Sequence, residues 1–157
     1  MAAPKLKKRL GDLLVDEDII TIDQLMSALS AQKETGRKLG SVLIDSGFIS
    51  EEQLLRFLAQ QLNLRFINIA NMQIDPKLAS ELSEVHARRL RALVLDSTED
   101  SVTIGMSDPA DLSAIEQLSN QFGNKSIEIV AVRESQLLIA FDSLYRRTKE
   151  IEQFAHQ

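Results

Sequence analysis

The 157-residue chain contains no cysteine and no tryptophan, and it has only one tyrosine. Without cysteine it can form neither a disulfide nor a thiolate metal site, and this composition fits a cytosolic protein. No apolar run reaches the length of about 18 residues that a transmembrane helix needs, so the sequence predicts no membrane span. The scarcity of aromatic residues argues against a base-stacking platform for single-stranded nucleic acid.

Positive charge is also scarce. The chain has 18 basic and 23 acidic residues and a net charge of −5, whereas a protein that binds duplex DNA carries a broad basic face. The sequence predicts short paired helices in its first 65 residues, and such helices could suggest a helix-turn-helix DNA-binding protein. Acidic residues such as Asp16, Glu17 and Asp18 crowd the first helix pair and argue against it. We therefore expect no nucleic-acid partner.

Motifs of common nucleotide-using enzymes are absent. The sequence has no G-x-x-x-x-G-K-[ST] loop and no G-x-G-x-x-G fingerprint. Its two histidines, His86 and His156, lie far apart without the spacing of metal ligands, and we expect both on the surface. The basic N-terminus lacks the apolar segment of a signal peptide. We expect this chain to carry no catalytic residue, no metal and no cofactor.

The most informative feature that is present is an internal repeat. Residues 9–32 and 38–61 align at an offset of 29, with a five-residue spacer, and nine of 24 positions are identical. The identical pairs are Leu10/Leu39, Gly11/Gly40, Leu14/Leu43, Asp16/Asp45, Ile20/Ile49, Gln24/Gln53, Leu25/Leu54, Leu29/Leu58 and Gln32/Gln61.

Each repeat unit has the pattern of a helical hairpin. A short apolar stripe, such as Leu10 with Leu14, predicts a first helix. Thr21-x-x-Gln24 in the first unit then resembles a capping box, and Ser50-x-x-Gln53 repeats it in the second unit. Leucines spaced by four residues follow each box and predict a second helix. The first 65 residues are thus expected to form four helices in two pairs.

A different pattern begins at Phe66. The sequence predicts a helix over 76–90, two strands joined by the acidic turn at 98–100, a helix over 110–123, a strand over 126–132 and a helix over 134–147. This order is α-β-β-α-β-α. We therefore predict an α+β fold with three segments: a helical tandem-repeat part at 1–65, a small α/β part at 66–147, and a tail or linker at 148–157.

Polar residues recur in the repeat, which an ordinary helical repeat does not require. Glycine near a helix start costs about 1 kcal/mol relative to alanine, so Gly11 and Gly40 need a reason. Close approach of the backbone to an anionic ligand is one, and close packing of two helices is the other. The basic residues Arg9 and Lys38 could contact a base or a phosphate, or they could be solvated.

The duplicated pattern R-L-G-x-x-L-V, followed by L-x-x-x-L-x-x-Q, resembles the MshEN domain family. The resemblance spans residues 9–61, and "MSDPADLSAIEQL" resembles the second part of the same domain. It implies the regulatory N-terminal domain of a type II secretion or type IV pilus ATPase, which binds cyclic di-GMP and does not hydrolyse it. It also implies a downstream motor domain as a partner and a cytoplasmic location at the inner-membrane face of a bacterial machine.

The resemblance further implies how the repeat is used. Cyclic di-GMP is two-fold symmetric, so each unit would contact one half of it. The implied ligand-binding residues are Arg9, Leu10, Gly11, Leu14, Leu25, Leu29 and Gln32 in the first unit, and Lys38, Leu39, Gly40, Leu43, Leu54, Leu58 and Gln61 in the second.

Arg37, Asp108 and two departures from the family pattern complete the prediction. Arg37 could neutralise a phosphate or be exposed to solvent. The Asp108 carboxylate could accept hydrogen bonds from guanine, or it could belong with Ser107 and Asp111 to the N-terminal cap of the helix over 110–123. Lys38 replaces arginine and predicts weaker base contacts in the second half-site. Asp18 replaces the glycine that the second unit has at Gly47, and we expect a tolerated turn.

A second function remains open on this resemblance. Related secretion ATPases use their N-terminal region to dock on an inner-membrane platform protein. A protein-docking module is therefore the alternative to a nucleotide sensor, and one chain could serve both functions on different faces.

Overall fold

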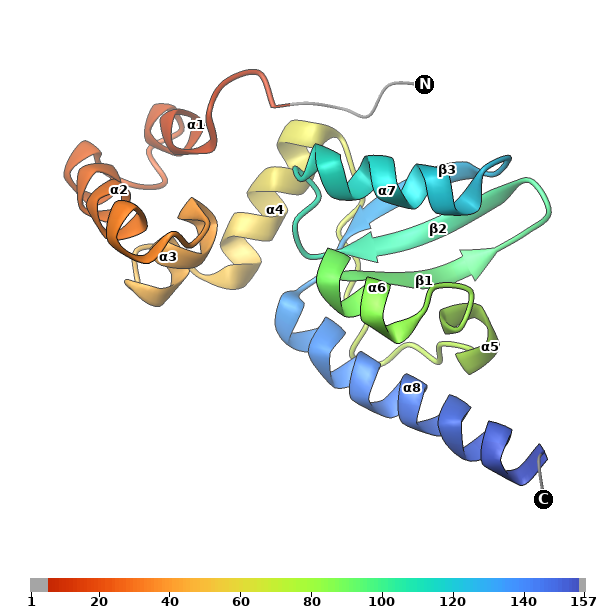
Figure 1. Ribbon diagram of the computed structural model, residues 1–157. Coiled ribbons are helices and arrows are strands. Elements are labelled where there is room, and N and C mark those ends of the chain that lie inside the picture. The colour runs from red at the N-terminus through yellow and green to blue at the C-terminus, as the bar shows by residue number, and fades with distance from the viewer. Residues whose placement is uncertain (1–5, 156–157) are drawn as a thin grey trace.

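The computed structural model describes the backbone of residues 6–155 and the side chains of residues 6–146. A helical part comes first, and an α/β part follows it along the chain (Figure 1). The helices of the helical part are α1 (Leu10–Asp16), α2 (Ile22–Thr35), α3 (Leu39–Asp45) and α4 (Glu51–Leu62). The elements of the α/β part are α5 (Pro76–Ala79), α6 (Glu84–Leu90), β1 (Ala92–Ser97), β2 (Ser101–Met106), α7 (Leu112–Phe122), β3 (Ser126–Ala131) and α8 (Glu134–Ala155).

The helical part consists of the two predicted hairpins, and both capping boxes are confirmed. The Thr21 hydroxyl accepts from the Gln24 amide at 3.1 Å, while the Gln24 side chain accepts from the Thr21 amide at 2.9 Å. Ser50 and Gln53 make the same reciprocal pair at 3.1 and 3.5 Å. Each box satisfies two amides that the helix start leaves without an intrahelical partner.

The turns inside the two hairpins are equivalent as well. Asp18 has φ +58° and Gly47 has φ +77°, so both residues adopt the left-handed conformation. Aspartate is among the few residues that tolerate this region, because its short side chain can bond locally. The expectation of a tolerated turn variant at Asp18 is therefore confirmed.

One apolar core holds the two hairpins together. It contains residues from all four helices and from the turns that join them. Its buried members are Leu13, Leu14, Ile20, Leu25, Ala28, Val42, Leu43, Ile49, Leu54, Phe57 and Leu58.

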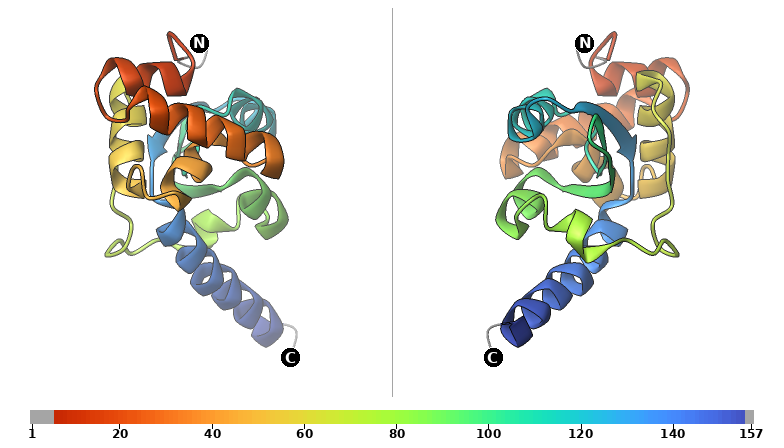
Figure 2. Two further views of the ribbon diagram at one scale, coloured as in Figure 1. Left: turned by 90° about the vertical axis from the view of Figure 1, so that its left-hand side faces the viewer. Right: turned by 90° about the vertical axis from the view of Figure 1, so that its right-hand side faces the viewer.

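The α/β part is built on a three-stranded sheet of order β1-β2-β3. Strands β1 and β2 are antiparallel, and β2 and β3 are parallel, with α7 as the crossover between them. Helices α5, α6 and α8 pack against β1, whereas α4 of the helical part packs against β3. Figure 1 shows the helical part at one end of the sheet, and Figure 2 shows α8 projecting from the body. The predicted α+β class is confirmed.

Two predictions about helices need correction. The helix expected over 76–90 is divided into α5 and α6, because Ser83 begins a new helix by accepting from the His86 amide at 3.3 Å. The last helix continues beyond residue 147 to Ala155, since that stretch contains neither glycine nor proline. The predicted tail is thus helical over 148–155, and residues 156–157 lie outside the described residues. No helix in the described part of the chain is long and apolar enough to span a bilayer.

Tyr145 attaches α8 to the segment between α5 and α6. Its side chain is buried, with 5% of the residue exposed, and its hydroxyl lies 3.0 Å from the Leu82 carbonyl and 3.3 Å from the Ala79 carbonyl. Burial raises the pKa of Tyr145 to about 12, and the negative charge of Glu84 acts in the same direction. The phenol therefore stays neutral, and remains a hydrogen-bond donor, at pH values well above the usual pKa of a tyrosine.

We predict that stability falls at alkaline pH through this group. The unfolded chain ionises Tyr145 near pH 10, whereas the folded chain holds the proton to about pH 12. The contribution of neutral Tyr145 to the free energy of unfolding, roughly 2–3 kcal/mol, is thus complete below pH 10 and is lost as the pH rises through 12. Urea unfolding between pH 8 and about pH 12 measures it.

Tyr145→Phe is the control, because this is the single tyrosine in the sequence. It should cost about 1–2 kcal/mol at neutral pH and should lose the extra alkaline destabilisation. Parallel stability curves for wild type and variant above pH 10 would contradict the prediction.

Candidate functional site

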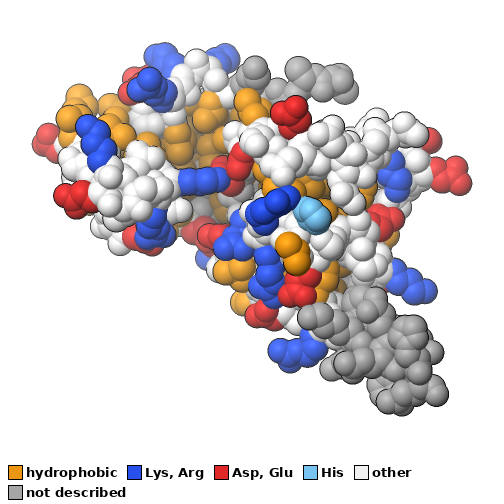
Figure 3. All heavy atoms as spheres, in the orientation of Figure 1, with side chains coloured by type: hydrophobic (Ala, Val, Ile, Leu, Met, Phe, Trp, Pro, Cys, Tyr) orange, Lys and Arg blue, Asp and Glu red, His pale blue; other side chains and the backbone are white. Residues whose placement is uncertain are grey.

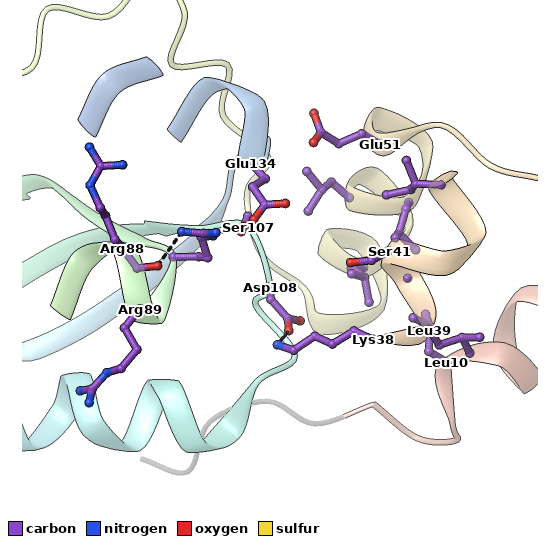
Figure 4. Close-up of a pocket in the computed structure, with 16 residues that line it drawn as sticks. Leu10, Lys38, Leu39, Ser41, Glu51, Arg88, Arg89, Ser107, Asp108 and Glu134 are labelled. Atoms are coloured by element: carbon purple, nitrogen blue, oxygen red, sulfur yellow. Dashed lines mark hydrogen bonds and ion pairs between the residues drawn. The ribbon is translucent and has the colours of Figure 1, made fainter. Parts of the chain in front are cut away.

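The two parts of the chain enclose a pocket of about 530 Å³ (Figure 4). The helical part supplies one wall, from the starts of α1 and α3 and from one face of α4. The α/β part supplies the other, from the end of α6, the β2–α7 loop and the start of α8. The lining residues are Leu10, Lys38, Leu39, Gly40, Ser41, Ile44, Glu51, Leu54, Leu55, Leu58, Arg88, Arg89, Arg91, Ser107, Asp108 and Glu134.

Lys38 crosses from the helical wall to the opposite one. Its ammonium group pairs with the Asp108 carboxylate and lies 3.3 Å from that of Asp111. Burial lowers the pKa of Lys38, but the hydrogen bonds and charges of these two aspartates outweigh it, and the net shift is upward. On the face in Figure 3, basic and acidic side chains lie together where the two parts meet. Lys38 is thus charged at neutral pH and joins the walls.

Asp108 and Asp111 have separate tasks. Asp111 is the N-cap of α7, since its carboxylate accepts from the Ala114 amide at 3.1 Å. Asp108 points toward Lys38 and lines the pocket (Figure 4). Of the three residues expected near the start of this helix, Ser107, Asp108 and Asp111, the N-cap is Asp111 and not Asp108.

Three arginines at the end of α6 supply positive charge on the α/β wall. Arg91 donates to Glu134 at 2.7 Å and to the Arg88 carbonyl at 2.7 Å. Arg88 pairs with Asp142 at 2.7 Å and with Glu84 at 2.9 Å, whereas Arg89 donates to a glutamine side chain at 3.1 Å. Most cations in this wall are therefore already paired with an acidic side chain of α6 or α8.

Seven of the predicted site residues line the pocket. They are Leu10, Lys38, Leu39, Gly40, Leu54, Leu58 and Asp108. The remaining nine predicted residues lie elsewhere in the helical part. They are Arg9, Gly11, Leu14, Leu25, Leu29, Gln32, Arg37, Leu43 and Gln61.

Some of those nine have a packing role or a local partner instead. Leu14 and Leu43 have no exposed surface, and Leu25 has 9%, so in this conformation all three hold the hairpins together. Arg37 pairs with Asp45 in its own hairpin. Arg9 is exposed, and no hydrogen bond or ion pair joins its side chain to another described residue.

The two repeated glycines permit close packing of helices. A Cβ on Gly11 would lie 2.5 Å from Leu25 and 3.2 Å from Leu39, and one on Gly40 would lie 3.0 Å from Leu54. In each unit the glycine therefore faces the leucine in the first turn of the second helix. Gly40 also lines the pocket, so this position packs two helices closely and forms part of the pocket wall.

Sequence reasoning did not include the residues of the α/β wall other than Asp108. The stretch "HARRLRA" does contain the signal, because three arginines fall within four positions. It has no motif-like spacing, and only the fold places it opposite α3. His86 lies exposed on α6, as expected, and His156 lies outside the described residues.

Residues 62–151 match the family model of the MshEN domain, which is more than half of the chain. The chain belongs to the MshEN domain family. The matched stretch covers the α/β part and does not include the duplicated motif. The family resemblance expected from the repeat is thus confirmed through a different part of the sequence.

Similar proteins agree with this assignment. A solved structure of MshE with cyclic di-GMP is 53% identical, with a TM-score of 0.79, over 88% of this chain and all of that chain. The N-terminal domain of XpsE shares the fold at 16% identity, with a TM-score of 0.66, over 90% of this chain and 97% of that one.

Two curated relatives are much longer than this MshEN domain. The type IV pilus assembly ATPase PilB of Myxococcus xanthus is 28% identical over 87% of this chain and 24% of its own length. The PilB ATPase of Thermus thermophilus is 28% identical over 74% of this chain and 13% of its own length. The chain therefore spans a quarter or less of these relatives.

We predict that Gly11→Ala destabilises the domain by about 1–2 kcal/mol, because overpacking against buried Leu25 outweighs the better helix propensity of alanine. Gly40→Ala is the matched control. Its closest contact is longer, at 3.0 Å, so the loss should be smaller. Urea denaturation of both variants tests this, and a Gly11→Ala variant as stable as wild type would contradict it.

Proposed function

We propose that this MshEN domain binds cyclic di-GMP in the pocket between its two parts and does not hydrolyse it. The observation that carries the proposal is the 53% identity with MshE, over all of a chain whose structure contains cyclic di-GMP. A relationship this close makes the same ligand the first candidate for the pocket of this chain.

The chemistry of the pocket supports a ligand of this kind. Its volume of about 530 Å³ falls within the range of about 300–1,000 Å³ that is usual for small-molecule sites. Leucines from α3 and α4 offer apolar surface for bases and riboses, while arginines of the α/β wall offer donors for phosphates. Asp108 adds an acceptor that could receive the hydrogen-bond donors of a guanine.

Arg9 is the residue we propose for the first half-site. It directly precedes Leu10, which lines the pocket, and its guanidinium is unpaired among the described residues. A free guanidinium can donate two hydrogen bonds to the O6 and N7 atoms of guanine. The other repeat residues outside the pocket, such as Gln32 and Gln61, would reach the ligand only if the hairpins shift upon binding.

In a longer protein, this domain would act as the regulatory N-terminal region of a pilus-assembly or secretion ATPase. ATP hydrolysis would then belong to residues outside this chain. Such a domain would work on the cytoplasmic side of the inner membrane, and docking on a platform protein there is compatible with ligand binding on another face.

Isothermal titration calorimetry of the 157-residue chain tests the proposal. We expect cyclic di-GMP to bind one-to-one, whereas GTP and cyclic di-AMP should give no comparable heat. Arg9→Ala should weaken binding by at least about 10-fold, because a hydrogen bond to a charged group contributes about 1.5–3 kcal/mol. Arg65→Ala is the control, since Arg65 pairs with Glu128 and does not line the pocket. No heat with wild-type protein at tens of micromolar would overturn the proposal.

Exchanging the two repeat cations tests their unequal roles. Lys38→Arg should tighten cyclic di-GMP binding several-fold, because arginine can fork onto two acceptors and lysine cannot. Arg9→Lys should weaken it for the same reason. If both variants bind cyclic di-GMP more tightly, or both bind it more weakly, the half-sites do not use these residues in the proposed way.

A further inference from the structure

The first turn of α8 lies where the two walls of the pocket meet. Arg133 donates to Glu51 at 2.9 Å, and the Ser135 hydroxyl donates to the same carboxylate at 2.8 Å. Glu134, between them in sequence, accepts from Arg91 at 2.7 Å. Three consecutive residues therefore join α8 to the helical wall through Glu51 and to the α/β wall through Arg91.

Both acidic partners in this arrangement also line the pocket. Figure 4 shows Glu51 and Glu134 on its opposite sides. The Arg91–Glu134 pair differs from the Arg88 pairs, because both of its members are lining residues. An anion that reaches the Arg91 guanidinium must share it with the Glu134 carboxylate, and the two negative groups repel one another.

We propose that the first turn of α8 senses whether the pocket is occupied. A ligand phosphate draws Arg91 away from Glu134, and Glu134 then releases the start of α8 from the α/β wall. Arg91 thereby contacts the ligand, while Glu134 acts as a positioning residue that competes for it. This inference rests on the proposed function, because it takes the phosphate of cyclic di-GMP as the competing anion.

The remainder of α8 is anchored to the α/β part, so the proposed change is confined to its first turn. Leu137 and Phe141 are fully buried, and Tyr145 is bonded to two carbonyls, so the helix stays anchored when its first turn changes partners. From Glu134 to Ala155 the helix has 22 residues, a length of roughly 33 Å at about 1.5 Å per residue. Its far end projects from the body, as Figures 1 and 2 show.

A double-mutant cycle on cyclic di-GMP affinity tests the competition. Glu134→Gln should tighten binding by about two- to fivefold, the range expected when a partly exposed ion pair no longer competes. Arg91→Ala should weaken binding, and in that background Glu134→Gln should tighten it less than in the wild type, because only the direct repulsion between carboxylate and phosphate is then removed. Glu128→Gln is the matched control, because it removes a carboxylate from the Arg65 ion pair outside the pocket.

Hydrogen–deuterium exchange of the full chain supplies a second readout. Saturating cyclic di-GMP should speed amide exchange in residues 136–138 of the wild type, whose bonds hold the first turn, and leave exchange in β2 unchanged. Glu134→Gln alone should already exchange faster in this segment without ligand, since its contact with Arg91 is weakened.

The possible outcomes separate this inference from the proposed function. Wild-type protein that does not bind cyclic di-GMP would overturn both. Normal binding with unchanged affinity in Glu134→Gln would overturn only the inference. Equal tightening with and without Arg91 would also overturn it, because it would reveal a general charge effect. Unchanged exchange in α8 upon binding would overturn its role as the sensing element.

Discussion

Helix α4 packs on two apolar cores at once, and the remaining structure depends on this. Leu54, Phe57 and Leu58 face the core of the two hairpins, whereas Leu55 and Ala59 pack with Ala131 of β3. A typical surface helix buries one apolar stripe and exposes its opposite face, but α4 buries two adjacent faces and leaves Glu52, Gln53, Arg56 and Gln60 in solvent. Because one rigid helix belongs to both parts, it fixes the distance between them, and the pocket forms along its length.

The forces across the pocket are weaker than those within each core. Besides the small α4–β3 cluster, the contacts between the two parts include the ion pairs of Lys38 with Asp108 and Asp111 and the contacts of Glu51 with Arg133 and Ser135. Ala110 also packs on the hairpin core, and the Arg56 guanidinium lies 4.7 Å from the centroid of the Phe66 ring. Partly exposed ion pairs of this kind contribute about 0–1 kcal/mol each. A ligand shifts an equilibrium only by its differential affinity for the two states, and exchanging the partners of such weak ion pairs costs little, while α4 keeps both cores in place. The proposed sensor role needs such an imbalance between strong cores and a weak junction.

The local structure of the helical part could be predicted from the sequence, because each capping box and each turn position occurs in both repeat units. Thr21 with Gln24 and Ser50 with Gln53 form the capping boxes that their spacing predicts, and Asp18 takes the turn conformation of Gly47. The pocket could be predicted only in part.

Lys38 and Asp108 are 70 residues apart, and nothing in either local pattern indicates that they meet. The arginines of α6 were missed because their role follows from tertiary packing, which no short-range spacing encodes. The division of the helix over 76–90 was missed because the Ser83 cap competes with an otherwise continuous apolar pattern.

The two repeat units have the same local fold but unequal surroundings, and this explains why their sequences differ where they do. The α/β part packs on the second unit, so Glu51 and Leu55 are in contact with it. The equivalent residues of the first unit, Ile22 and Met26, are 65% and 58% exposed.

The basic residues that precede the two repeated glycines also differ in their surroundings. Lys38 faces two aspartates of the α/β part, and a flexible lysine with a point charge can approach both, while Arg9 faces no acidic partner among the described residues and keeps a planar guanidinium available. A two-fold symmetric ligand would therefore meet a site whose halves are related in backbone but not in charge. We infer that the first unit provides recognition, and that the second unit couples recognition to the α/β part.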